Sequence, residues 1–436
     1  MKTKILGLCL ISVCLAAPAA DEPMATNTLS LDFAIGEALA KNPLLKAARA
    51  SWEAMRERIP QARAWEDARI EFATLAGRVI SLPANSMTDQ RFAFEQAIPL
   101  SGKNVLRARV ADADAVAAFE EMRRVELELI LKTSVAYYRL ANAYQQLAIN
   151  EKNIALLKQF AEITRAKYEA GRQSQADVLG AETEVARLAE TLFDFRRQIS
   201  ESETQLNVLM NRRADVAIAR PETGEFEPRD FSPDTTEALA LINRPELVIA
   251  QNRIAAAKLK RQLAQRDKSF PDPSVRLEAS RYNGAAEPVG EVMAGISISL
   301  PWFNSKKYDA AIRESDKMRE AAEHQLESLR TETMGLVRDQ LRKIQTYHHH
   351  TELSRHHLLS LAEQTVTSKR LSYETDKAPF LELLMAQRNV REIEAMYWNH
   401  WADYNMAVAE LEALTGTQRT RLRLIPNSTE NKSDNQ

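Results

Sequence analysis

The sequence predicts a mainly α-helical fold that carries a membrane β-barrel and is built from a unit that occurs twice. Three observations predict it. Proline-containing motifs return at a constant interval, two long stretches carry apolar residues at coiled-coil spacing, and four short stretches alternate apolar with polar residues. Each unit therefore combines two strands with one long helical hairpin.

The duplication is visible in residues that return at a fixed offset. Asn42-Pro43 is answered by Arg244-Pro245, and Pro99 is answered by Pro301, both 202 positions later. Solenoid proteins repeat units of roughly 20–50 residues. A unit of more than 200 residues instead predicts two similar halves of one architecture.

The first residues predict export. Residues 1–19 combine lysines, an apolar run and a small-residue cleavage site, which is typical of a signal peptide. Both cysteines, Cys9 and Cys14, lie inside it, and neither follows a small residue, so lipid attachment and disulfides are not expected. The formal net charge of −2, with both signs interleaved, argues against a nucleic-acid partner.

Proline and glycine positions predict the borders of the two units. The order along the chain is a signal peptide at 1–19, a first repeat at 20–211, a connector at 212–236, a second repeat at 237–416 and a polar tail at 417–436. The connector is rich in proline, which is typical of a segment between folded units.

In each repeat, a helical hairpin is expected after the strands, at about 101–210 and at about 305–415. Apolar residues recur there at alternating spacings of three and four, the coiled-coil period. Ser101 to Lys167 alone is 67 residues, which as a helix span roughly 100 Å. Such a stripe cannot be buried against one small core, so it must pack on the other hairpin or on neighbouring chains.

Strands are expected before each hairpin, at about 68–75 and 91–98, and at about 275–282 and 292–300. Alternation of period two gives each strand one apolar and one polar face. No run after the signal approaches the ~20 apolar residues of a membrane-spanning helix. Four strands are too few for a membrane barrel, which needs about eight, so several chains must pool their strands.

On these features, residues 30–416 resemble the TolC-type outer membrane factors. The segment Gln96-Ala97-Ile98-Pro99-Leu100-Ser101-Gly102-Lys103 is similar to the strand-to-helix junction of members that serve heavy-metal efflux pumps. Asn104 departs from that pattern, which has Arg at this position. The resemblance implies a homotrimer with a twelve-stranded barrel in outer membrane lipid and an α-helical tunnel in the periplasm.

The function implied by the resemblance is a passive exit duct of a tripartite efflux system. Its partners would be a periplasmic adaptor and an inner-membrane RND-type pump, and its cargo heavy-metal cations. Two alternatives remain open at this point: a duct for drugs or organic solutes, and a periplasmic coiled-coil scaffold. No catalytic motif was found, so no enzyme activity and no cofactor are expected.

In the family, the periplasmic mouth is closed by the hairpin tips, through a Tyr–Asp hydrogen bond and an acidic ring. By position these roles fall on Tyr373, Asp177 and Glu382, with Asp376 a further candidate. The second tip departs from the pattern, because Asp376 stands in place of Gly and Ala378 in place of Arg. The closing contacts can therefore differ here. The alternative is an ordinary solvated helix turn.

A histidine cluster is the remaining candidate for chemistry. It comprises His348, His349, His350, His356 and His357. Members seven residues apart share a helix face but lie about 10 Å apart, too far to share one metal ion. A polar helix surface is the favoured interpretation, and a weak metal site the alternative.

Overall fold

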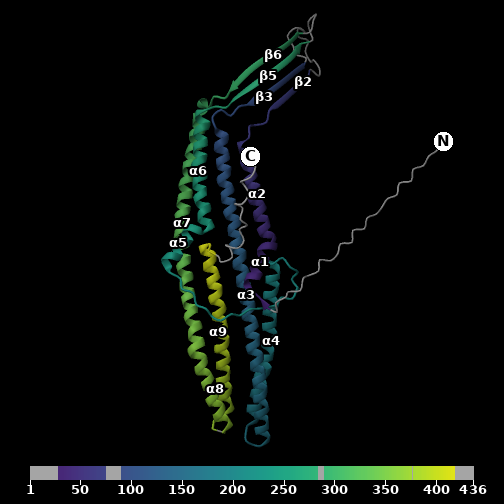
Figure 1. The fold of residues 1–436 in the computed structure, drawn as a ribbon, viewed down its shortest axis with the longest axis vertical. Helices are drawn as coiled ribbons and strands as arrows, with labels where there is room; N and C mark the ends of the chain where they lie inside the picture. Colours follow the sequence, from purple (N-terminus) through teal and green to yellow (C-terminus); the bar gives the residue numbers. More distant parts are fainter. Residues whose placement is uncertain (1–27, 75–89, 283–288, 376, 418–436) are drawn as a thin grey trace, which may run out of the picture.

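The computed structural model describes residues 28–74, 90–282, 289–375 and 377–417. The predicted signal peptide and nearly all of the predicted tail lie outside these residues, as does Asp376. Within them the molecule is long and narrow. A strand layer forms one end, side-by-side helices form the middle, and two hairpin tips form the other end (Figure 1).

The first repeat contains two short helices, two sheet strands and a long hairpin. In chain order its elements are α1 (Leu31–Lys41), α2 (Pro43–Arg63), β2 (Arg69–Thr74), β3 (Gln90–Ala97), α3 (Lys103–Glu169) and α4 (Gln175–Leu209).

The second repeat follows the same order with one interruption. Its elements are α5 (Pro233–Asn243), α6 (Pro245–Ser269), β5 (Pro273–Tyr282), β6 (Val289–Ile298), the 3-10 turn η2 (Pro301–Asn304), α7 (Ser305–Leu353), the π-helical turn η3 (Ser354–Leu358), α8 (Leu359–Glu374) and α9 (Phe380–Thr415). Between the repeats, β4 (Arg220–Pro221) pairs in parallel with β1 (Thr28–Leu29), so the connector is fastened to the start of the first repeat.

The Asn-Pro and Arg-Pro motifs each separate two helices. Pro43 and Pro245 stand at the first helical positions of α2 and α6, where a missing N–H costs nothing. The Asn42 side chain accepts a hydrogen bond from the N–H of Leu44 at 2.9 Å and donates one to the carbonyl of Leu209 at 2.9 Å. Asn42 therefore caps α2 and also ties it to the end of α4.

The four strands form one antiparallel sheet in the order β2-β3-β5-β6. Its register places Phe72, Phe92, Ala279 and Val292 in one row across the sheet. Because side chains alternate between faces, all four lie on the same, apolar face. The predicted alternation is confirmed, and the sheet joins strands from both repeats through the β3–β5 pair.

Below the sheet, the helices continue the order of the strands. α2 packs on α3, α3 on α6, and α6 on α7, so the four helices form a layer. Farther along, α3 packs on α4 and α9, while α8 packs on α9. No helix among the described residues is long and apolar enough to cross a membrane.

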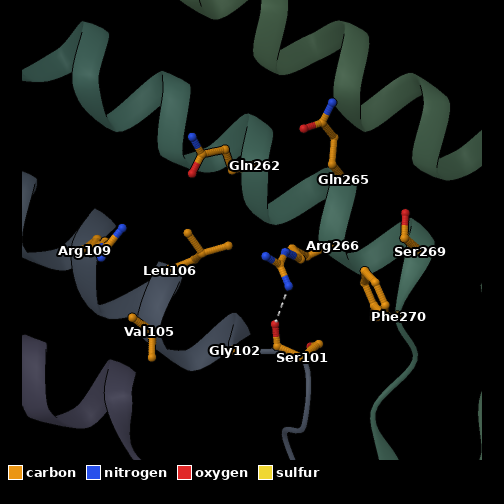
Figure 2. Close-up of a pocket in the computed structure, with 10 residues that line it drawn as sticks. All are labelled: Ser101, Gly102, Val105, Leu106, Arg109, Gln262, Gln265, Arg266, Ser269 and Phe270. Atoms are coloured by element: carbon orange, nitrogen blue, oxygen red, sulfur yellow. Dashed lines mark hydrogen bonds between the residues drawn. The ribbon is translucent and has the colours of Figure 1, made fainter.

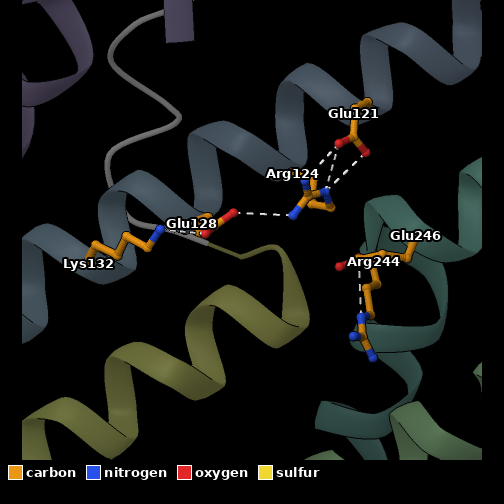
Figure 3. Close-up of polar contacts among 6 residues, drawn as sticks. All are labelled: Glu121, Arg124, Glu128, Lys132, Arg244 and Glu246. Carbon is orange, nitrogen blue, oxygen red and sulfur yellow. Dashed lines mark hydrogen bonds and ion pairs between the residues drawn. The ribbon is translucent and has the colours of Figure 1, made fainter. Parts of the chain in front are cut away.

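A series of ion pairs lies on the surface of α3 (Figure 3). Arg124 contacts Glu121 at 2.7 Å and Glu128 at 3.2 Å, and Lys132 contacts Glu128 at 2.6 Å. The hydrogen bond from Lys132 lowers the pKa of Glu128, although burial partly opposes it. Such pairs, three or four residues apart, stabilise a helix by only about 0.2–0.5 kcal/mol each. These pairs stabilise the long helix α3 itself but do not determine which other helices pack on it.

Candidate functional site

The two hairpin tips lie beside each other at the end of the molecule farthest from the sheet (Figure 1). The first tip turns between α3 and α4, where Gly171 adopts a φ of 72° that suits glycine. The side chain of Ser174 then caps α4 by accepting a hydrogen bond from the N–H of Asp177. The second tip differs, because Pro379 stands at the N-cap of α9 and no side chain caps that helix.

Tyr373 joins the two tips. Its side chain is only 3 % exposed, and its hydroxyl lies 3.0 Å from the hydroxyl of Thr164 on α3. Lys167 donates to the Tyr373 carbonyl at 2.8 Å, and its ammonium lies 4.2 Å from the centre of the phenol ring. Phe380 packs on the same ring. The second tip is thus held against α3 by one aromatic side chain.

Within one copy, the described residues show other partners for Tyr373 and Asp177, and the closing bond expected between them stays a prediction. The Asp177 carboxylate accepts hydrogen bonds from Ser174 at 2.6 Å and from Gln173 at 2.9 Å. The physical reason is local: an acidic side chain in the first turn finds the cap residue before any distant partner. The phenol of Tyr373 turns instead into the apolar contact between the hairpins.

Glu382 lies in the first turn of α9, where a carboxylate is favoured by the helix dipole. It is half exposed and pairs with Lys369 of α8 at 2.6 Å. Its predicted place in an acidic ring stays a prediction, as do the gate roles of Tyr373 and Asp177. The fourth candidate, Asp376, lies outside the described residues.

A buried ion cluster behind the tips was not predicted from the sequence. Glu184 of α4 is 2 % exposed and contacts Arg388, while Arg391 lies 3.6 Å from its other oxygen. Close by, Gln387 donates to Asn153 at 3.1 Å, again between the repeats. A signal existed in the sequence, because Glu184 stands on the apolar stripe of α4 between Ala181 and Leu188.

The junction between strand and helix contains a buried cation. Lys103 of the quoted motif is 4 % exposed and pairs with Asp272 at 3.0 Å and Asp267 at 3.3 Å. Asn104, which replaces the Arg of the resembled pattern, donates to the carbonyl of Ala64 at 2.7 Å. The motif therefore ties the start of α3 to the end of α2 and to the α6–β5 junction.

The polar face of the sheet carries a charge network across three strands. Arg276 of β5 lies 3.2 Å from Glu278, 3.4 Å from Glu71 and 3.7 Å from Glu95. Arg91 contacts Glu278 at 2.8 Å.

The opposite face of the sheet is apolar and bare. Val292 is 81 % and Ile296 is 72 % exposed. One face is therefore suited to water and the other to an apolar environment.

The histidines of the predicted cluster meet several different partners. Among the described residues, no three His, Cys, Asp or Glu side chains are grouped to hold a metal ion. His348 stacks on Phe226 of the connector, His356 lies 3.3 Å from Glu352, and His350 faces His400 with ring centres 4.9 Å apart.

Burial favours the neutral form of His400. Burial, followed by the nearby His350, lowers the pKa of His400.

The sequence and the fold were compared with those of known proteins. The profile of the family described as "Outer membrane efflux protein" matches residues 34–212 and 238–417, one match for each repeat. The chain is 23 % identical to the nickel-cobalt-cadmium resistance protein NccC of Alcaligenes xylosoxydans xylosoxydans, over 77 % of this chain and 74 % of that protein.

Two further comparisons span different shares of the chain. Identity to the toluene efflux pump outer membrane protein TtgF of Pseudomonas putida is 22 %, over 50 % of this chain and 45 % of that protein. The solved structure of the Campylobacter jejuni CmeC outer membrane channel has a similar fold, with a TM-score of 0.74 and 15 % identity. That match covers 96 % of this chain and 94 % of CmeC.

Proposed function

Because this chain belongs to the outer membrane efflux protein family, we propose that it is the exit duct through which a periplasmic adaptor and an inner-membrane RND-type pump expel heavy-metal cations. The protein resides in the bacterial outer membrane and extends into the periplasm. Three copies form the duct. It supplies a wall and a gate, needs no cofactor and catalyses no reaction, since the pump provides the energy.

The observation that carries this proposal is the two-faced sheet with open edges. Strands β2 and β6 are the two edges of the sheet in the described chain. An apolar face in lipid requires that every backbone group be hydrogen-bonded, which an open edge cannot satisfy. Pairing β6 of one copy with β2 of the next closes the sheet around a charged interior. Three copies supply twelve strands, enough for a water-filled barrel.

The cargo is inferred from similarity and from charge. NccC, whose name refers to nickel, cobalt and cadmium, spans most of this chain. The proposed lumen carries Glu71, Glu95 and Glu278, which favour cations, although Arg91 and Arg276 balance part of that charge. Organic solutes are the second candidate, because TtgF is named for toluene efflux. The shorter match to TtgF makes this candidate weaker.

The gate lies at the hairpin tips. The contacts of Tyr373 with Thr164, and of Glu184 with Arg388, hold the second hairpin to the first. An adaptor that binds the open arrangement better would shift the population toward it. Glu382 would face the entrance and attract cations. Asp177 would also lie at this entrance, and Asp376 stays a further candidate for the gate.

A deletion strain tests the function. Complementation with the intact gene should restore tolerance to nickel, cobalt and cadmium salts but not to toluene, and the protein should migrate as a heat-modifiable trimer from outer membranes. Restored toluene tolerance alone would favour the organic-solute duct. Recovery as a soluble periplasmic protein without a trimer would favour the scaffold alternative.

A further inference from the structure

One pocket at the junction of sheet and helices lies outside the function described so far. It measures about 560 Å³ and opens between the start of α3 and the end of α6 (Figure 2). Its lining comprises Ser101, Gly102, Val105, Leu106, Arg109, Gln262, Gln265, Arg266, Ser269 and Phe270. Two arginines and two glutamines thus line it, and no carboxylate does.

Neither arginine of the pocket is paired with a carboxylate. Arg266 donates to the Ser101 carbonyl at 3.1 Å, and its guanidinium carbon lies 5.6 Å from the centre of the Phe270 ring. Both contacts leave its positive charge unpaired. In the described part of the chain, Arg109 makes no side-chain hydrogen bond or ion pair. A pocket with two unpaired guanidinium groups favours an anion, above all a phosphate group.

The carboxylates of this region lie on the other side of the helix layer. At 100° per residue, Asp267 points roughly 140–160° away from Gln262, Gln265 and Ser269 of the lining, and about 100° away from the adjacent Arg266. Asp267 and Asp272 pair with Lys103 on that opposite side. Asp272 stands two residues before Ser274 and four before Arg276. Because side chains alternate along a strand, Asp272 and its partner Lys103 lie under the charged face of the sheet. The pocket therefore opens under the apolar face.

Its depth matches the lipid headgroup layer. Ile98 directly follows β3 on its apolar face, and Ser101 follows three residues later through a turn, so the two lie less than the roughly 10 Å that an extended chain would span. A bilayer has a hydrocarbon core of roughly 30 Å inside a total of about 40–45 Å, so each polar layer is several ångströms thick. With the apolar face in hydrocarbon, the pocket lies at the periplasmic headgroups.

Assembly does not cover the pocket. It lies between α3 and α6, the two central helices of the layer, whereas α2 and α7 form its edges. Neighbouring copies in a closed ring meet those edges. Val105 and Phe270 of the lining are about half exposed and can contact acyl chains.

From these observations we propose that the pocket binds the phosphate diester of an anionic glycerophospholipid from the periplasmic leaflet. Arg109 and Arg266 contact the phosphate, Gln262 and Gln265 donate hydrogen bonds to its ester and headgroup oxygens, and the acyl chains follow the apolar face of the sheet. The site would set the depth of the duct in the membrane at the point where sheet and helices join.

Native mass spectrometry of the delipidated full-length protein tests the site. The probes are dioctanoyl phosphatidylglycerol, dioctanoylglycerol without phosphate, and inorganic phosphate. Phosphatidylglycerol should bind at least about tenfold more tightly than either of the others. Arg109→Gln with Arg266→Gln should remove that preference, and Arg253→Gln, an exposed change on the same helix about 20 Å away, should preserve it.

Three outcomes would overturn the proposal. Equal binding of dioctanoylglycerol would show a merely apolar surface, and equal binding of inorganic phosphate would show a site for free anions. Undiminished phosphatidylglycerol binding by the double variant would place the lipid elsewhere. If Arg266→Gln prevents assembly because the Ser101 contact is lost, Arg109→Gln alone provides the same test, since Arg109 has no hydrogen bond or ion pair to lose within the described residues.

Discussion

The two hairpins arise from one duplicated pattern, yet they are stabilised in different ways. In the first, α3 runs unbroken to Glu169, and the tip is fixed by its own residues, Gly171 and Ser174. In the second, a π-helical turn interrupts the helix at Ser354–Leu358, and α9 begins after Pro379 without a side-chain cap. The conformation of the first tip is stabilised by contacts within that tip, whereas the second tip is held by contacts with the first hairpin.

This difference indicates which hairpin can move. Interruptions of the π type are frequent at functional sites, because they weaken the regular hydrogen-bond ladder. The second hairpin is held through Tyr373 and through the arginines that meet Glu184. Breaking those contacts should release the second tip while the first keeps its shape. The predictions below test this, from the largest expected effect to the smallest.

Glu184→Ala should have the largest effect. It leaves Arg388 and Arg391 without their buried partner, and loss of one member of a buried pair costs about 3–5 kcal/mol. Because both arginines are partly exposed, we expect roughly 2–3 kcal/mol. Single-channel conductance in planar bilayers should rise, and cells should become more permeable to large antibiotics.

The matched control for this variant is Glu190→Ala, an exposed change on the same helix, which should leave conductance at the parent value. An assembled Glu184→Ala trimer with parental conductance would show that the buried cluster does not hold the gate.

Tyr373→Phe should open the gate to a smaller extent. It removes one hydrogen bond to Thr164, worth about 0.5–1.5 kcal/mol per chain. Thr164→Val should have a similar effect, and the two changes together should cost little more than either one. Asp177→Ala should not raise conductance, because its contacts lie within the first tip. A larger opening by Asp177→Ala than by Tyr373→Phe would restore the closing bond implied by the family resemblance.

Ser174→Ala should act on the first tip alone. Loss of an N-cap typically costs about 1 kcal/mol and frays the first turn of the helix. Hydrogen exchange should quicken at the start of α4 and remain unchanged at Tyr373. Conductance should also stay constant. Faster exchange in both tips would mean that the first hairpin is not self-contained.

Mild acid should affect only the second hairpin, because all seven histidines of the chain lie between His324 and His400. Burial lowers the pKa of His400, so its stabilising contribution is present above the ordinary histidine pKa and is lost as pH falls from that value through the lower pKa of the folded protein. Burial raises the pKa of Asp403, so its titration acts in the opposite direction, but in a more acidic range.

The measurement is the melting temperature of the trimer between about pH 7.5 and about pH 5.5, the range in which histidine titrates. We expect the melting temperature to fall slightly over this range, and we expect a smaller fall in the His400→Gln variant. An equal decrease in the variant would assign the effect to other groups.

Much of the fold could be predicted because it follows from local periodicity. The strand segments and both hairpins were predicted to within a few residues, since alternation of period two and spacing near 3.5 are properties of the chain itself. The proline junctions were visible for the same reason. The candidate site was predicted less well. Tyr373 does lie at a contact between the repeats, but its partner is Thr164.

What the sequence by itself determined is the duplicated unit, the two faces of each strand and the lengths of the helices, because these depend on residues close together in the chain. Only the tertiary structure decided which side chains meet. Glu184 and Arg388 are 204 residues apart, and Arg109 and Arg266 reach one pocket from different repeats. Such contacts depend on how two long helices are rotated about their axes, and a shift of one residue turns a side chain by 100°. Periodicity fixes the apolar stripe of a helix but not the partner that each polar residue finds beside it.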